Sequence, residues 1–192
     1  MDTPLVLYTI GHSNHPAATF LALLRQHNIR LLVDVRSAPY SRYVPHFNKQ
    51  ELAAFLQANG VEYRYAGEYL GGQPKDTAVY KEQPTPGDDA KRSDYGKQVD
   101  YLAVMQQEWY QRGIRRLLDL VAETAGGVTI LCSEANPHDC HRHHLITRSL
   151  LDPAVRITAQ NIQVQHILKD GTLEVAAAAD FQTAEPRQPR LL

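Results

Sequence analysis

The stretch LVLYTIGHSNHPAATFLALLRQHNIRLLVDV, residues 5–35, decides the fold of this chain. It begins with the β-prone apolar run LVLYTI and ends with the apolar run RLLVDV, each of a length that suits a buried strand. Between the two runs, Phe20, Leu24 and His27 follow one another at spacings of four and three residues, which predicts a helix. A strand, a helix and a second strand in this order form the unit from which parallel sheets are built.

The pattern continues with a second helix and a third strand. Residues 48–60 carry a helix start signal, Asn48 followed by Glu51, and a stop signal at Gly60. The alternating run VEYRYA that follows suits a strand. The first third of the chain therefore has the order β-α-β-α-β, which is typical of a parallel sheet covered by helices.

The later elements complete one domain. They are two helical runs separated near Gly113 (residues 98–111 and 114–127), a buried strand (128–133), a helix (143–151) and a hairpin (163–176). We predict an α/β fold, a three-layer α/β/α sandwich with a mostly parallel sheet and a C-terminal hairpin. Residues 1–180 would form this single domain, with a long loop excursion at about 67–95 and a flexible tail over 181–192.

Composition limits the location and the partners of the chain. Its 192 residues carry a net charge of −1, which argues against a large non-specific nucleic-acid footprint but leaves room for a pocket for one phosphate or nucleotide. No apolar run approaches the roughly 20 residues of a membrane span, and the N-terminus has no basic signal region. We therefore expect a cytoplasmic protein without membrane contact, whose cysteines stay reduced. The sequence specifies neither a cofactor nor an oligomeric state.

Three of the predicted strands end in polar clusters. These are GHS at residues 11–13, DVR at 34–36 and CSEANPHDCHR at 132–142. In a parallel sheet the carboxyl ends of the strands lie along one edge, and ligands bind in the crevice outside that edge. We therefore expect the three segments to meet at a single site.

The first two clusters each have a structural and a functional interpretation. Ser13 or Asn14 suits a helix cap, which leaves His12 as a candidate acid-base residue. Asp34 and Arg36 lie two positions apart and face the same side of a strand end. They would form either an internal ion pair or an anion site in which Asp34 orients a base.

The third cluster contains both cysteines of the chain. Cys132 ends an apolar strand and would be either an inert buried thiol or, with Glu134 two positions on, part of the site. Cys140 is expected in the first turn of the following helix, capped by Asp139. There the helix amides and Arg142 would lower the pKa of the thiol, and Asp139 would oppose them. A reactive or ligand-contacting role for Cys140 is the preferred interpretation.

Two familiar site types do not fit the spacing. A phosphatase-type loop is not indicated, because Cys132 and Arg142 are ten positions apart and no glycine lies between them. Zinc would have enough potential ligands, namely Cys132, Cys140, His141, His143, His144 and the nearby His12. Seven residues separate the cysteines, and the three neighbouring histidines cannot all face one point on a helix, so no metal site is predicted.

Aromatic side chains follow the second predicted strand and lie in and after the third. They include Tyr40, Tyr43, Phe47, Tyr63, Tyr65 and Tyr69, interleaved with Arg42, Arg64 and His46. Such side chains would stack on a base or a sugar near the same edge of the sheet. Ordinary packing beneath a long loop is the alternative.

Four segments, taken together and in order, resemble the bacterial and archaeal family called domain of unknown function 488. They are YTIGHSNHPAATFLALLRQHNIRLLVDVRSAPYSRYVPHFN, LQANGVEYRYAGEYLGG, ILCSEANPHDCHRHHLI and VQHIL, within residues 8–168. The resemblance implies a single cytoplasmic α/β domain and supplies no established reaction. It also implies signature positions at Gly11, His12, Ser13, Asp34, Val35, Arg36, Pro39, Gly71, Gly72, Cys132, Glu134, Cys140, His141 and Arg142.

The leading hypothesis is an enzyme, a hydrolase or transferase, that acts on an anionic, phosphate-bearing or nucleotide-like substrate at this edge. Cys140 would be the nucleophile or a ligand-contacting thiol, with His141 or His12 as the acid-base residue. Arg36 and Arg142 would hold the anion. The other candidates are Cys132, Glu134 and Asp34 for catalysis and Ser13, Tyr40, Gly71 and Gly72 for substrate binding. The alternatives are a non-catalytic nucleotide or nucleic-acid binding module, and a thiol redox or metal-binding protein.

Overall fold

The computed structural model describes residues 3–81 and 99–182. Within these ranges the chain is an α/β fold with a six-stranded sheet in the order β3-β2-β4-β1-β5-β6. The strands are β1 (Leu5–Gly11), β2 (Ile29–Asp34), β3 (Glu62–Tyr65), β4 (Gly127–Cys132), β5 (Ile162–Ile167) and β6 (Leu173–Val175). Neighbouring strands are parallel except β5 and β6, which form an antiparallel hairpin. The predicted fold class, the mostly parallel sheet and the C-terminal hairpin are confirmed.

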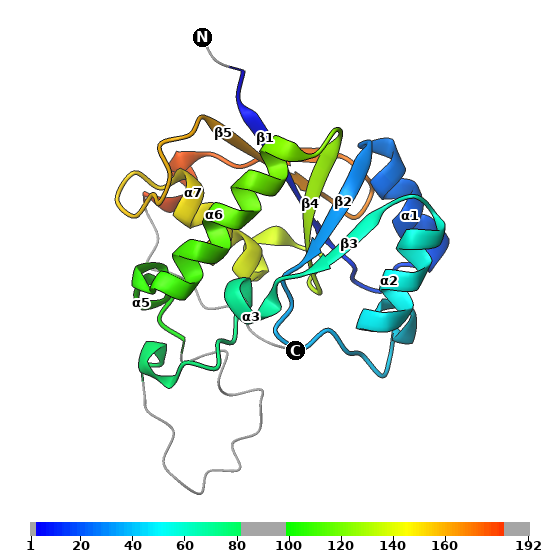
Figure 1. Cartoon of the computed structure of the whole chain (residues 1–192), viewed down its shortest axis with the longest axis horizontal. Coiled ribbons are helices and arrows are strands. Elements are labelled where there is room, and N and C mark those ends of the chain that lie inside the picture. The colour runs from blue at the N-terminus through cyan, green and yellow to red at the C-terminus, as the bar shows by residue number, and fades with distance from the viewer. Residues whose placement is uncertain (1–2, 82–98, 183–192) are drawn as a thin grey trace, which may run out of the picture.

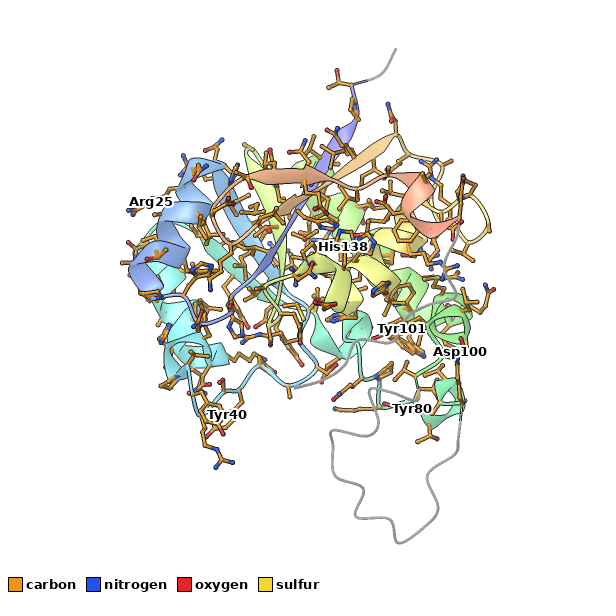
Figure 2. The ribbon with its side chains drawn as sticks, turned by 180° about the vertical axis from the view of Figure 1, so that it is seen from behind. Arg25, Tyr40, Tyr80, Asp100, Tyr101 and His138 are labelled. Carbon is orange, nitrogen blue, oxygen red and sulfur yellow. The ribbon has the colours of Figure 1, made fainter. Side chains whose placement is uncertain are left out.

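Helices cover both faces of the sheet (Figure 1). They are α1 (Ala17–Gln26), α2 (Lys49–Ala58), α3 (Gly67–Leu70), α5 (Tyr101–Gln106), α6 (Glu108–Glu123) and α7 (Arg148–Leu151). The helices α1 and α2 pack on one face, and α6 with α3, α5 and α7 packs on the other. Arg25, near the end of α1, lies at the outer edge of its layer in the view from behind (Figure 2). No helix in the described ranges is long and apolar enough to cross a membrane.

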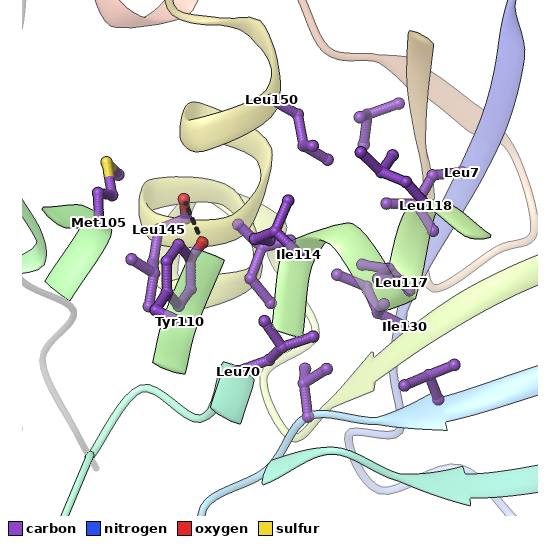
Figure 3. Packing of buried hydrophobic residues seen from close by; sticks show 14 of the residues in the cluster. Leu7, Leu70, Met105, Tyr110, Ile114, Leu117, Leu118, Ile130, Leu145 and Leu150 are labelled. Atoms are coloured by element: carbon purple, nitrogen blue, oxygen red, sulfur yellow. Dashed lines mark hydrogen bonds between the residues drawn. The ribbon is translucent and has the colours of Figure 1, made fainter. Parts of the chain in front are cut away.

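Each face of the sheet has its own apolar core. Under α6, the side chains of Leu7, Ile114 and Ile130 are fully buried. Tyr110 is buried among them, and its hydroxyl group donates a hydrogen bond of 3.3 Å to the carbonyl oxygen of Leu145 (Figure 3). Burial of a large apolar side chain contributes roughly 1.5–3 kcal/mol, so this cluster holds the helical layer to the sheet. The opposite core is centred on Phe20, Leu32 and Leu56.

Two helix boundaries differ from the prediction. The break between α5 and α6 falls at Gln107, so the prediction of a break near Gly113 is wrong and this glycine lies inside α6. Glycine is required there because a Cβ atom at position 113 would lie 2.9 Å from the Cβ atom of Tyr69. Tyr69 belongs to α3, a short helix that occupies the start of the expected loop excursion. Residues 82–95 of that excursion and residues 183–192 of the expected tail lie outside the described residues.

The connection after β4 differs from a simple loop and α-helix. Pro137–Asp139 form a 3₁₀ turn, and Arg142–Thr147 form a π-helical turn that continues into α7. The hydroxyl group of Thr147 donates a hydrogen bond of 2.7 Å to the carbonyl oxygen of Arg142, five residues earlier, which stabilises the wider turn. Single π turns occur frequently at functional sites, and this one begins two residues after Cys140.

Candidate functional site

The carboxyl ends of β1, β2 and β4 lie side by side, as the predicted topology requires. Gly11 at the end of β1 pairs with Cys132, and the backbone N–H of His12 donates a hydrogen bond of 2.9 Å to the Cys132 carbonyl oxygen. Glycine is needed at position 11 because a Cβ atom there would lie 1.7 Å from the carbonyl oxygen of Glu134. The segment after β4 is therefore held tightly against the end of β1.

A cavity of about 200 Å³ opens at this edge of the sheet. It is lined by Arg36, Ser37, Ala38, Gly72, Gln73, Tyr101, Cys132, Ser133, Glu134, Cys140 and His141. Pockets for drug-sized ligands are larger, roughly 300–1,000 Å³. The cavity therefore suits a small substrate or a small group of a larger one.

Two thiols, an imidazole and a carboxylate converge in this cavity, and we call Cys132, Glu134, Cys140 and His141 the thiol–histidine cluster. The Nδ1 atom of His141 lies 3.4 Å from the sulfur of Cys132 and 3.7 Å from the sulfur of Cys140. The Cys132 thiol donates a hydrogen bond of 3.0 Å to Oε2 of Glu134. The Nε2 atom of His141 lies 3.2 Å from the carbonyl oxygen of Val35. Because a carbonyl oxygen only accepts hydrogen bonds, this contact places a proton on Nε2 and leaves Nδ1 of the neutral ring with a free lone pair.

Cys140 does not lie in the first turn of a helix, so that part of the prediction is wrong. The residue has an extended backbone (φ −133°, ψ 147°), and its carbonyl oxygen accepts hydrogen bonds from the backbone N–H groups of His143 and His144. Its sulfur accepts a hydrogen bond of 3.5 Å from the backbone N–H of Arg142. Cys140 itself thus occupies the capping position assigned to Asp139, whose carboxylate accepts a hydrogen bond from the Asn136 side chain instead.

Burial and mutual interaction push the pKa values of the two thiols in opposite directions. Burial and then the neighbouring Cys140 raise the pKa of the Cys132 thiol well above its usual value. Burial also acts to raise the pKa of Cys140, but the neighbouring Cys132 thiol and the positive charges of Arg142 and His141 outweigh it and lower that pKa. The pKa of Glu134 is raised, first by burial and then by the charge on Cys140. Burial opposes the charged form of His141, and the charge on Cys140 outweighs it and raises its pKa.

Asp34 and Arg36 form an internal ion pair, the structural alternative for this cluster. The Nε and Nη2 atoms of Arg36 donate hydrogen bonds of 2.9 and 2.6 Å to the two carboxylate oxygens of Asp34. Nη2 also donates to the carbonyl oxygen of Phe47, and the Tyr63 hydroxyl group donates to Asp34 at 2.8 Å. Arg36 lines the cavity with most of its donors engaged, and Asp34 orients this arginine and not a histidine.

Arg142 and His12 do not line the cavity. The fully buried guanidinium group of Arg142 donates hydrogen bonds of 2.7 and 3.0 Å to the carbonyl oxygens of Glu134 and Ala135, so it holds the segment after β4 in place. The ring of His12 stacks on Phe47 at a centroid distance of 4.5 Å. Burial, followed by the charge of Arg36, lowers the pKa of His12 to about 4.

Of the four remaining residues predicted to contact a substrate, Gly72 lines the cavity and Gly71, Ser13 and Tyr40 do not. Gly72 lines the cavity, and a Cβ atom there would lie 2.8 Å from Cγ of His141. Gly71 lies behind it, where a Cβ atom would be 2.4 Å from the Ser37 hydroxyl oxygen. Ser13 does not line the cavity, and Tyr40 is 72% exposed on a loop apart from Tyr101 (Figure 2).

Several lining residues were not among the sequence candidates. Tyr101 of α5 is 4% exposed and reaches the cavity from the helical layer. Ser37 and Gln73 are joined by a hydrogen bond from the backbone N–H of Gln73 to the Ser37 hydroxyl oxygen, 2.9 Å long. Ser37 and Gln73 adjoin the predicted Arg36 and Gly72, so proximity in sequence was a usable signal for them. Tyr101 carried no such signal.

His143, considered above as a zinc ligand, belongs to a different group on the other side of the π-helical turn. Its Nδ1 atom lies 3.0 Å from Nε2 of His166, whose Nδ1 atom lies 2.8 Å from the Thr9 hydroxyl oxygen. Burial, followed by neighbouring positive charges, lowers the pKa of both histidines to about 3. Both are therefore neutral at physiological pH and tie the helix to strands β1 and β5.

Comparison with known proteins gives one match. A family model described as domain of unknown function DUF488 matches residues 16–149. Searches of curated proteins and of solved structures gave no match. The matched segment covers more than half of the chain and includes β2, β4 and all members of the thiol–histidine cluster. The chain therefore belongs to the DUF488 family.

Proposed function

We propose that this protein is a cytoplasmic enzyme that transfers or hydrolyses a group of a small anionic substrate, with the thiol–histidine cluster as its reactive centre. The observation that carries the proposal is the convergence of two thiols, an imidazole and a carboxylate on one small cavity at the carboxyl edge of a parallel sheet. Such edges are where α/β folds bind ligands, and groups with shifted pKa values concentrate at catalytic sites.

The charges around the cavity favour a negatively charged substrate of the phosphate-bearing or nucleotide-like kind. Arg36 lines the cavity, and the buried charge of Arg142 lies close enough to the cluster to oppose the effect of burial on the pKa values of both thiols. Arg142 forms no ion pair with a carboxylate in the described ranges of the chain. A buried cation without a carboxylate partner favours a nearby anion, because the low local dielectric strengthens their attraction. Arg142 therefore favours the thiolate form of Cys140, and Arg36 is the cationic group that lines the cavity where a substrate would bind.

Glu134 is the acid-base residue of the proposal. Its carboxylate lines the cavity, and burial raises its pKa, which brings proton exchange closer to neutral pH.

A panel of phosphoesters, nucleotides and acyl esters tests the proposal. Product release is measured for the wild type, for Glu134→Gln and for the control Glu51→Gln, at an exposed residue of α2. We expect turnover of one substrate class, reduced about 100-fold or more by Glu134→Gln and unchanged by the control. The absence of turnover in every class, or equal rates in all three proteins, would overturn it.

A thiol redox function is the second candidate, because the two sulfur atoms lie within 4.8 Å of each other. Oxidation would join them in a disulfide, with two electrons and two protons passing to an added oxidant such as a peroxide. Mass spectrometry after peroxide treatment tests this: a loss of about two mass units that dithiothreitol restores supports the candidate. Sulfinic or sulfonic products without a disulfide would exclude it.

A further inference from the structure

We propose that Cys132, Cys140 and His141 form a zinc site with one coordination position open to the cavity. The ligand atoms, two Sγ atoms and Nδ1, lie within 4.8 Å of one another, and the two S···Nδ1 distances are 3.4 and 3.7 Å. In a tetrahedral site with Zn–S near 2.3 Å and Zn–N near 2.0–2.1 Å, neighbouring sulfur and nitrogen ligands are about 3.6 Å apart. The two sulfur–nitrogen edges of the cluster therefore already have the lengths of a tetrahedral zinc site. The two sulfur atoms lie within 4.8 Å of each other, and zinc would hold them at about 3.8 Å.

The orientation of His141 supports the same assignment. Its Nε2–H group donates to the carbonyl oxygen of Val35 at the end of β2, which directs the lone pair of Nδ1 toward both sulfur atoms. Histidines that bind metals in proteins almost always donate their other ring N–H group in this way. The side chain is therefore held in the tautomer and the orientation that a metal ligand needs.

The ligand types select zinc over the hard cations of the cell. Thiolate and imidazole ligands favour Zn²⁺, whereas Mg²⁺ and Ca²⁺ prefer oxygen ligands. Two thiolates would also balance the charge of one Zn²⁺ ion in a buried place. The sequence had argued against a metal on two grounds: the seven residues between the cysteines, and three neighbouring histidines that cannot all face one point on a helix. The ligands instead come from a strand end, an extended residue and the residue that starts a helix.

The fourth position faces the cavity, which all three ligands line. Catalytic zinc sites have three protein ligands and an open position for water, and structural sites are closed by four. The Oε2 atom of Glu134 lies 3.0 Å from the sulfur of Cys132, close enough to accept a proton from a water molecule in that position. The catalytic role of the zinc site rests on the proposed function. In that role a zinc-bound water would be the nucleophile, which the sequence had assigned to Cys140.

Metal analysis of the full-length protein tests the site. We expect about one zinc per chain by elemental analysis after purification without chelator, and a sulfur-to-cobalt charge-transfer band in the near ultraviolet after exchange with Co²⁺. Cys140→Ser and His141→Ala should each lose most of the zinc and of the band. His138→Gln is the matched control, because this histidine lies in the same segment, is 45% exposed and is outside the cluster. Circular dichroism of each variant reports whether it is folded.

A measurement on the wild type alone covers the case in which a variant fails to fold. Zinc should protect both cysteines from alkylation by iodoacetamide, and a chelator should remove this protection. The site would be overturned if wild-type protein contained no zinc, gave no cobalt–sulfur band and gained no protection from added zinc. Full zinc content in Cys140→Ser and His141→Ala would overturn it as well. Turnover by metal-free protein would overturn the role of zinc-bound water as the nucleophile and leave the proposed function standing. Zinc binding without turnover of any substrate class would overturn the proposed function and leave the zinc site standing.

Discussion

The ion pair between Asp34 and Arg36 is the most buried one in the described ranges, with the two side chains 0% and 4% exposed. Two nitrogen atoms of Arg36 contact the two carboxylate oxygens of Asp34. Arg36 also donates a hydrogen bond to the Phe47 carbonyl oxygen, and the Tyr63 hydroxyl group donates one to Asp34. This residue pair anchors the end of β2, next to Val35, whose carbonyl oxygen orients His141. The pair therefore supports the site through the backbone and through charge, and not through direct attack on a substrate.

Removal of one partner of this pair should destabilise the protein strongly. Asp34→Asn leaves the guanidinium charge of Arg36 buried without a counter-charge, and we expect a loss of about 3–5 kcal/mol in the free energy of unfolding. Chemical denaturation at neutral pH measures it. Glu62→Gln is the control, since it breaks the exposed pair of Glu62 and Arg64 and should change stability by less than about 1 kcal/mol. Equal effects of the two substitutions would contradict the structural role of the buried pair.

At the scale of elements, the site depends on the close approach of backbone segments at two glycines. Gly11 lies at the end of β1, and a methyl group there would overlap the carbonyl oxygen of Glu134. Gly11→Ala should therefore destabilise the protein by about 3 kcal/mol or more. The control is Gly60→Asn at a position with φ +76° and no atom near its Cβ, where asparagine is tolerated. Denaturation curves that show the same stability for Gly11→Ala and wild type would refute this packing.

Gly72→Ala tests the second approach. Its methyl group would lie 2.8 Å from Cγ of His141 and would push the ring away from the two sulfur atoms. We expect the affinity for zinc to fall at least about tenfold while the protein remains folded. Competition with a chromophoric chelator measures the affinity. An unchanged affinity, with the variant folded, would show that the position of His141 is not held by this contact.

The arrangement of the elements was more predictable than the contacts of the side chains. The apolar runs that end at Gly11, Asp34 and Cys132 specified parallel strands, and parallel strands place their carboxyl ends together whatever the loops do. The ion pair of Asp34 and Arg36 was one of the two alternatives that the sequence left open. The contact of Arg36 with the Phe47 carbonyl oxygen and the capping role of Cys140 were not predictable, because both depend on local backbone geometry. The 3₁₀ turn at Pro137–Asp139 and the π-helical turn after it change the residue at which the helix begins. Neither turn has a periodic sequence pattern by which it could be predicted.

At the scale of the whole molecule, the buried pair of His143 and His166 links stability to pH. Their pKa values are about 3 in the folded protein and near 6.5 in the unfolded chain, so unfolding takes up protons between these values. Stability is therefore complete above about pH 6.5 and is lost as the pH falls through this window. His138 and Arg142 add positive charge beside both histidines and strengthen the effect.

We expect each of the two histidines to contribute a loss of about 1–2 kcal/mol between pH 7.5 and pH 5. Chemical denaturation at the two pH values measures it, with chelator present throughout so that metal release does not contribute. The double variant His143→Gln and His166→Gln retains polar side chains but does not titrate, so its stability should change less with pH. A double variant with the same pH dependence as wild type would contradict the assignment.

The account as a whole depends on both thiols and His141 acting as one centre at the sheet edge. X-ray absorption at the zinc edge of the purified protein tests this most directly, because it counts the sulfur atoms bound to the metal. We predict two sulfur atoms at about 2.3 Å and nitrogen or oxygen atoms at about 2.0–2.1 Å. A metal shell of nitrogen and oxygen atoms alone, or protein that contains no zinc, would contradict it.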